Sequence, residues 1–353
     1  MSYLIVIWQI ACVLVLASLL WMITLILLRI IRTHRQSLYT KQRQQILEAM
    51  AQILWDEKGE AAILDETLWK SPMVPEVFLE FVALVRGEER DRLIARMVRY
   101  RVDDEFRRLL RHRFRFVRHA AVEALAYFPG LPTAKAVDSL VERSANRDLR
   151  IAGIRTLVAV GAYPTVPDVM REFSKLNGST RSLQSVLSKL ALHRSRDILE
   201  YLGRPGVPDL ERAALLSALG GSADYSVLGI LEAALSSDVP LIRVAALDGL
   251  ASLEHPDAAP AIASCLKDTD WSVRAGAVKA LCEISYDTYA AQVADLLSDP
   301  VWLVQFEAAQ ALADMGASGR ELLEVSAISK GNESANRTAA LALAELSAME
   351  AVQ

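Results

Sequence analysis

Most of the chain places apolar residues at helical spacing, in a block that returns at a nearly constant interval. The block VRHAAVEAL (117–125) recurs as LRIAGIRTL (149–157), SLQSVLSKL (182–190), ERAALLSAL (211–219), IRVAALDGL (242–250), VRAGAVKAL (273–281), VQFEAAQAL (304–312) and NRTAALALA (336–344). The second positions of successive copies are 29–33 residues apart. Because a single repeat cannot bury its apolar face alone, the pattern predicts an all-α protein with an α-solenoid of about eight or nine helix pairs.

A turn that contains Asp or Pro separates the two predicted helices of a repeat, as at Asp238, Asp268 and Asp299-Pro300. Asp is suited to cap the helix that follows, and Pro fits its first turn. Arg stands at the second position of most copies. We expect it to bond across the turn to an Asp or a carbonyl of the adjacent repeat, forming a ladder. Departures at Leu183 and Gln305 predict looser repeats or a bend.

These copies resemble HEAT repeats, and among them the short HEAT-like repeats first noted in phycobilisome lyases. The resemblance rests on copies of the pattern D-x-x-[VI]-R-x-x-A-x-x-A-L and covers the predicted solenoid, residues 81–353. It implies a scaffold whose extended surface binds peptides or domains, and it transfers no catalytic residue. A HEAT-like hydroxylase family builds a di-iron site from His-Glu pairs, but none of the five histidines here is followed by Glu.

The first 32 residues follow a different pattern. Ser2 to Leu28 contains no charged residue, and a helix of about 27 residues spans about 40 Å, more than the ~30 Å hydrocarbon core of a bilayer. The basic start and small-residue cleavage site of a signal peptide are missing. We therefore predict a single transmembrane anchor over residues 1–32. Arg29, Arg32 and Arg35 follow it, so the positive-inside rule predicts an external N-terminus and a cytoplasmic repeat domain in a bacterial inner membrane.

Residues 33–80 are helical in pattern but out of phase with the repeats. The stretch QRQQILEAMAQILWDEK places Ile46, Met50, Ile53 and Leu54 on one face of an amphipathic helix. Gly59 interrupts the pattern, and another apolar helix follows. We interpret residues 33–80 as a helical stalk and an N-terminal cap for the solenoid.

Composition and charge narrow the chemistry. Hydrophobic residues make up 52% of the chain, which indicates a folded protein, and three cysteines do not form a disulfide framework. A Gly-rich phosphate loop and the motifs G-x-S-x-G, C-x-x-C and H-E-x-x-H are missing from the sequence. We therefore predict no enzymatic activity, no cofactor and no metal site. A lyase- or hydroxylase-like HEAT enzyme stays open as an alternative.

Arginines concentrate in the part of the chain nearest the predicted anchor. Residues 1–199 hold 30 basic and 21 acidic residues, whereas 200–353 hold 9 and 22. The densest part of the cluster consists of Arg107, Arg108, Arg111, Arg113 and Arg115. It is interpreted as a solvated surface, a contact for anionic lipid in a lipid-organising protein, or a contact for an acidic protein partner. Nucleic acid fits poorly with the acidic second half.

Two tryptophans stand at equivalent turn positions 31 residues apart, Trp271 and Trp302. A solenoid places such residues along one ridge, where tryptophan can anchor a partner protein, although each could instead pack over its own turn. Taken together, these features predict a membrane-anchored, non-catalytic scaffold or adaptor. Its solenoid binds a protein partner at the membrane, to assemble or regulate a membrane enzyme complex.

Overall fold

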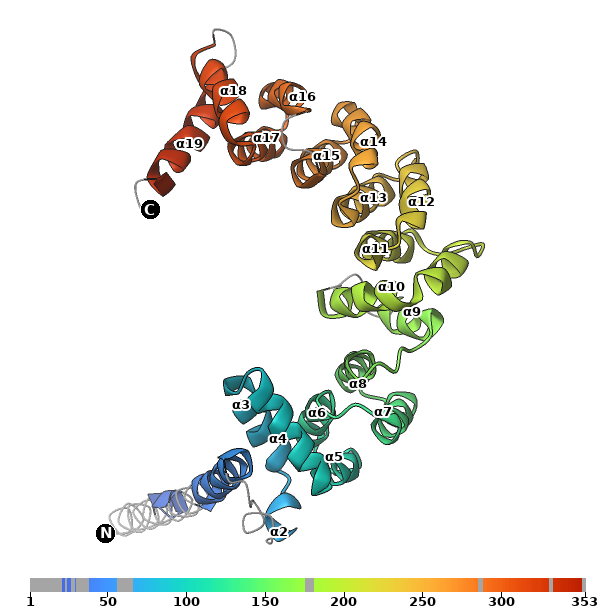
Figure 1. The fold of residues 1–353 in the computed structure, drawn as a ribbon, viewed down its shortest axis with the longest axis vertical. Coiled ribbons are helices and arrows are strands. Elements are labelled where there is room, and N and C mark those ends of the chain that lie inside the picture. The colour runs from blue at the N-terminus through green and yellow to red at the C-terminus, as the bar shows by residue number, and fades with distance from the viewer. Residues whose placement is uncertain are drawn as a thin grey trace, which may run out of the picture. The chain divides into compact units, whose positions relative to one another are not determined.

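The computed structural model describes residues 38–55, 66–174, 181–284, 288–329 and 333–350, together with isolated positions between 21 and 29 (Figure 1). Within these ranges the secondary structure is helical throughout and contains no strand, as the sequence predicts. The chain divides into two compact units, residues 1–160 and 161–353. The predicted boundaries at residues 32 and 80 stay predictions.

Most of the predicted transmembrane segment lies outside the described residues, and so do Arg32 and Arg35. Arg29 is described and is helical and exposed. In the described ranges, no helix combines the length and the apolar character needed to cross a bilayer. The membrane anchor and its orientation therefore stay predictions.

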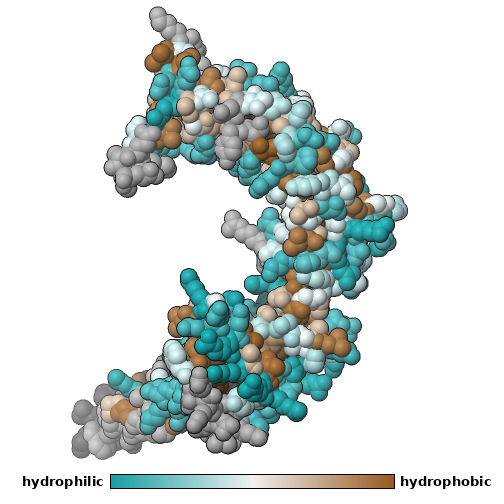
Figure 2. Space-filling model, in the orientation of Figure 1, coloured by the Kyte–Doolittle hydropathy of each residue, from teal (hydrophilic) through white to brown (hydrophobic). Residues whose placement is uncertain are grey.

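The first unit begins with the helix at residues 38–55. It continues with α2 (Glu66–Trp69), α3 (Val74–Leu84), α4 (Glu88–Arg99), α5 (Val102–Leu109), α6 (Arg115–Leu125), α7 (Leu131–Arg143) and α8 (Arg147–Ala159). Helices α3, α6 and α8 pack in succession, while α5 and α7 pack against them and against each other (Figure 1). Figure 2 shows hydrophilic residues over much of the visible surface of this unit.

The core of the first unit is built as its sequence pattern requires. Ile46, Met50, Ile53 and Leu54 are all buried, which confirms the predicted apolar face of the helix at 38–55. The exposed side of this helix is joined to α3 by an ion pair between Arg43 and Glu80, whose N and O atoms are 2.5 Å apart. This helix therefore packs onto the unit.

An aromatic cluster fills the space between α3, α5 and the end of α6. The ring of Phe78 lies 5.6 Å from Phe106, 5.6 Å from Tyr127 and 5.4 Å from Phe128, measured between centroids. Phe78, Phe106 and Phe128 are almost completely buried. Aromatic rings at these separations and tilted angles attract each other in addition to the area they bury.

The second unit contains α9 (Val166–Ser174), α10 (Arg181–Leu202), α11 (Asp209–Leu219), α12 (Leu228–Ala234), α13 (Pro240–Leu253), α14 (Ala259–Ser264), α15 (Trp271–Ile284), α16 (Ala290–Asp295), α17 (Trp302–Asp314), α18 (Gly316–Ile328) and α19 (Glu333–Glu350). Short 3-10 helices extend it at η2 (Gly220–Ser222), η3 (Tyr225–Val227), η4 (Pro256–Ala258), η5 (Cys265–Lys267) and η6 (Leu296–Ser298). Helices α11, α13, α15, α17 and α19 pack in succession as one layer. Helices α12, α14, α16 and α18 form the other (Figure 1).

The loosest copy of the sequence pattern coincides with an irregular helix. Helix α10 is broken at Arg194, whose backbone is non-helical at φ −140° and ψ 37°. The side chain of Leu183 lies outside the described residues. This break agrees with the bend expected from the degenerate copy at 182–190.

Close helix contact in the second unit depends on Gly249. A Cβ atom at this position of α13 would lie 2.6 Å from the carbonyl oxygen of Leu216 in α11 and 3.1 Å from Leu231. A methyl group cannot fit there unless the two helices separate.

We expect Gly249→Ala to destabilise the second unit by about 1–3 kcal/mol, since overpacking forces the helices apart. Gly229→Ala in α12 is the matched control, because a Cβ there meets nothing within 4 Å. The control should be neutral or gain up to about 1 kcal/mol from helix propensity. Denaturant unfolding of both variants measures this difference. Equal stabilities would contradict the close approach of α11 and α13.

Candidate functional site

The turns that precede five of the helices are built in the same way. In each, a polar side chain accepts a hydrogen bond from the backbone N–H two residues later, which closes a short local turn. The donor–acceptor distances are 2.8–3.3 Å, and the accepting residues are His112, Ser144, Ser237, Asp268 and Asp299. We call this place in each repeat the turn position.

The residue six positions after the turn position joins it to the helix. Arg150 donates to the carbonyl of Ser144 at 2.9 Å, Arg243 to that of Ser237 at 2.8 Å, and Arg274 to that of Asp268 at 2.8 Å. Gln305 donates to the carbonyl of Asp299 at 2.6 Å. Because Gln305 is buried and makes the same bond as the arginines, the expectation of a looser repeat there is wrong.

Two of these arginines also reach the turn position of the next repeat. Arg243 donates to the Asp268 carboxylate at 2.7 Å, and Arg274 donates to both Asp299 carboxylate oxygens at 2.7 and 2.9 Å. These bonds confirm the predicted ladder from α13 to α17. Burial alone would raise the pKa of Asp299, but the hydrogen bonds from Arg274 and from the Val301 N–H outweigh it and hold the pKa below its usual value.

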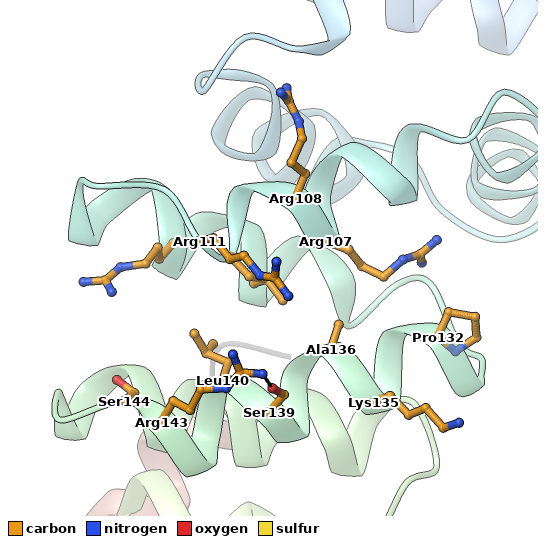
Figure 3. Close-up of a pocket in the computed structure, with 12 residues that line it drawn as sticks. Arg107, Arg108, Arg111, Pro132, Lys135, Ala136, Ser139, Leu140, Arg143 and Ser144 are labelled. Carbon is orange, nitrogen blue, oxygen red and sulfur yellow. Dashed lines mark hydrogen bonds between the residues drawn. The ribbon is translucent and has the colours of Figure 1, made fainter.

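The first unit contains a cavity of about 640 Å³ between α5, α6 and α7, which we call the basic groove (Figure 3). Besides apolar and small residues, its lining includes the cations Arg107, Arg108, Arg111, Arg118, Lys135 and Arg143. Figure 3 shows Arg107 and Arg111 on one side, and Ser139 and Arg143 on the facing helix α7. Residues from three successive elements therefore build one positively charged site.

Carboxylates neutralise only two of these cations. Arg107 pairs with Asp103 at 2.7 Å and with Asp104, and Arg108 pairs with Glu105 at 2.6 Å. The other four cations form no ion pair with any residue that the structure describes. They are Arg111, Arg118, Lys135 and Arg143. Such a surplus of positive charge in a hollow favours an anionic ligand.

The predicted arginine cluster is therefore divided by the fold. Arg107, Arg108 and Arg111 line the basic groove. Arg113 instead stacks over the ring of Phe114 at 4.4 Å, and Arg115 makes an exposed ion pair with Asp148 at 3.0 Å. Sequence reasoning missed Lys135 and Arg143, because α7 follows the cluster along the chain and only helix packing brings its residues to the groove.

The two predicted tryptophans occupy equivalent places in the second unit. Trp271 is the first residue of α15 and Trp302 the first residue of α17, and these two helices pack against each other. Their exposed fractions are 44% and 61%. The ring of Trp302 stacks on Phe306 with centroids 5.4 Å apart. Both therefore present large aromatic surfaces to solvent.

The buried thiol groups offer no obvious chemistry. Burial raises the pKa of both Cys265 and Cys282, so the reactive thiolate is disfavoured at each. Over the described ranges, no three residues among His, Cys, Asp and Glu come together in a way that could hold a metal ion.

Paired helices stacked in sequence define a helical-repeat protein, and comparison with known families specifies the repeat. Residues 259–344 match the family model for HEAT repeats, and residues 242–268 match the one for the PBS lyase HEAT-like repeat. Residues 242–344 of this chain are thus HEAT repeats. No curated protein matches the chain.

Several solved structures are similar to the chain in fold. Human deoxyhypusine hydroxylase is 17% identical with a TM-score of 0.31, and the match covers 88% of this chain and 98% of that one. Kap121p bound to Nup53p is 14% identical with a TM-score of 0.37, covering 86% and 41%. The CpcE–CpcF complex of phycocyanin lyase from Nostoc sp. PCC7120 is 17% identical with a TM-score of 0.29, covering 69% and 87%.

Proposed function

We propose that this protein is a non-catalytic scaffold whose HEAT-like repeats bind a protein partner at a membrane, to assemble or regulate a membrane enzyme complex. The observation that carries the proposal is the exposure of Trp271 and Trp302 at the same position of two packed helices. Tryptophan is enriched among the residues that dominate protein–protein binding energy. Helical repeats offer an extended surface that suits such binding.

The membrane part of this proposal rests on the sequence. The uncharged stretch from Ser2 to Leu28, followed by Arg29, Arg32 and Arg35, supports a single span with an external N-terminus and cytoplasmic repeats in a bacterial inner membrane. Resistance to alkaline carbonate extraction, with the repeats cleaved by protease only from the cytoplasmic side, would support this topology. Release of the protein by carbonate would contradict it.

Affinity purification from mildly solubilised membranes, followed by mass spectrometry, tests the scaffold function. We expect one stoichiometric partner with the wild-type chain and loss of that partner in the double variant Trp271→Ala/Trp302→Ala, because the anchoring aromatic surface is removed. Trp55→Ala is the matched control, since Trp55 is also exposed but lies in the first unit. Absence of any stoichiometric partner would contradict the proposal.

A lipid-organising role is the second candidate, favoured by the four cations of the basic groove that lack a carboxylate partner. Anionic headgroups attract such a surface with about 1 kcal/mol per suitably placed Lys or Arg. This role predicts binding to anionic vesicles that weakens steeply as salt increases.

A further inference from the structure

The arginine ladder of this chain lacks its carboxylate at two of the turn positions. Asp268 and Asp299 accept from arginines that stand 25 residues before them, Arg243 and Arg274. The corresponding turn positions in two other repeats hold Ser144 and Ser237, which make the same local turn bond but carry no charge. Arg118 and Arg212 are the arginines that face them in the repeat order.

Arg118 consequently has no partner for its guanidinium. Its Nε atom is buried without an acceptor, and its side chain makes no ion pair or hydrogen bond with any described residue. A buried donor without an acceptor costs about 1–3 kcal/mol. The site is therefore held ready for an acceptor that the chain itself does not supply.

Arg118 and Ser144 both line the basic groove, beside Arg111, Lys135 and Arg143. The cavity at Arg212 and Ser237 is different. Its volume is about 520 Å³, and Arg212 is the one cation in a lining that is otherwise apolar or small. Only the groove at Arg118 therefore combines an unpaired ladder arginine with further positive charges that would attract an acidic ligand.

We propose that the basic groove binds an acidic peptide segment, one carboxylate of which pairs with Arg118 in the place of the missing ladder aspartate. The chain shows the chemistry twice, since Arg243 and Arg274 hold Asp carboxylates, the latter through two N–H···O bonds. Arg111, Lys135 and Arg143 hold the neighbouring acidic side chains of the segment. This inference rests on the proposed function, because it assigns the segment to the protein partner.

The test uses the full chain in detergent and a fluorescein-labelled oligoglutamate peptide of about ten residues, with affinity measured by fluorescence anisotropy at about 0.05 M salt, where charges are weakly screened. Ser144→Asp supplies the missing carboxylate from the chain itself. We expect it to weaken peptide binding at least about tenfold, because Arg118 is then occupied.

Ser237→Asp is the matched control. It makes the same substitution at an equivalent turn position and changes net charge equally, but it lies in the other cavity. It should bind the peptide as the wild type does. Lys135→Glu, at an exposed lining residue outside the ladder, should also weaken binding, which keeps the test valid if Ser144→Asp fails to fold.

Equal peptide affinity in Ser144→Asp, Lys135→Glu and wild type would overturn the inference. Tighter binding of inorganic phosphate or of phosphatidylglycerol vesicles than of the peptide, lost in Lys135→Glu, would also overturn it and reassign the groove to phosphate groups. A natural partner that is lost in Trp271→Ala/Trp302→Ala but retained by Ser144→Asp and Lys135→Glu would overturn the inference while leaving the scaffold function intact.

Discussion

Asp299→Ala is expected to destabilise the region of α15 and α17 by about 3–5 kcal/mol, since removing one partner of a buried ion pair leaves the other charge uncompensated. The Asp299 side chain is only 3% exposed and accepts two hydrogen bonds from Arg274 at 2.7 and 2.9 Å. It also accepts the Val301 N–H at 2.8 Å, which fixes the turn before α17. The substitution therefore removes a charge partner and a turn bond together.

Hydrogen exchange of peptides from α15 and α17 measures this loss where it occurs. We expect exchange to accelerate by roughly 100-fold or more, as a local free energy change of this size requires. Arg337→Ala is the control, because the pair of Arg337 with Glu333 is 80% and 90% exposed and such pairs contribute about 0–1 kcal/mol. If both variants exchange at the wild-type rate, the ladder does not stabilise the repeats.

Phe78→Ala is expected to destabilise the first unit by about 3–5 kcal/mol, the usual cost of emptying a buried aromatic site. Phe78 is fully buried and its ring lies within 5.6 Å of three other aromatic rings, those of Phe106, Tyr127 and Phe128. The cavity would open between α3 and α6, which pack directly against each other.

Urea unfolding followed by circular dichroism measures the effect on the first unit. Phe116→Ala is the control, since Phe116 is 66% exposed and only stacks on Phe114. A midpoint for Phe78→Ala no lower than that of the control would show that the aromatic cluster is not the core of this unit.

Much of the fold follows from the sequence because its rules are local and periodic. The apolar face of Ile46, Met50 and Ile53 is a helical pattern, and the structure buries it. The ladder of Arg243 and Arg274 follows from the repeat period, since residues one repeat apart stand at equivalent places on neighbouring helices.

Other features depend on packing that a periodic pattern does not specify. The division of the chain at residue 160 falls inside the predicted solenoid, and nothing in the copies before and after it marks this position. The basic groove was half predicted, because Arg107, Arg108 and Arg111 are adjacent in sequence, whereas Lys135 and Arg143 reach it only through packing of α7 against α5. A signal for the groove existed, since alignment of the repeats places Ser144 where Asp268 and Asp299 stand.

The most direct test of the scaffold function is the dissociation constant of the purified partner for the purified full chain, measured by calorimetry in one detergent. The account predicts saturable, stoichiometric binding that weakens at least about thirtyfold in Trp271→Ala/Trp302→Ala, the effect expected of a hot spot worth 2 kcal/mol or more. Chemical conversion of the partner by the chain, or binding that does not saturate, would contradict a non-catalytic scaffold.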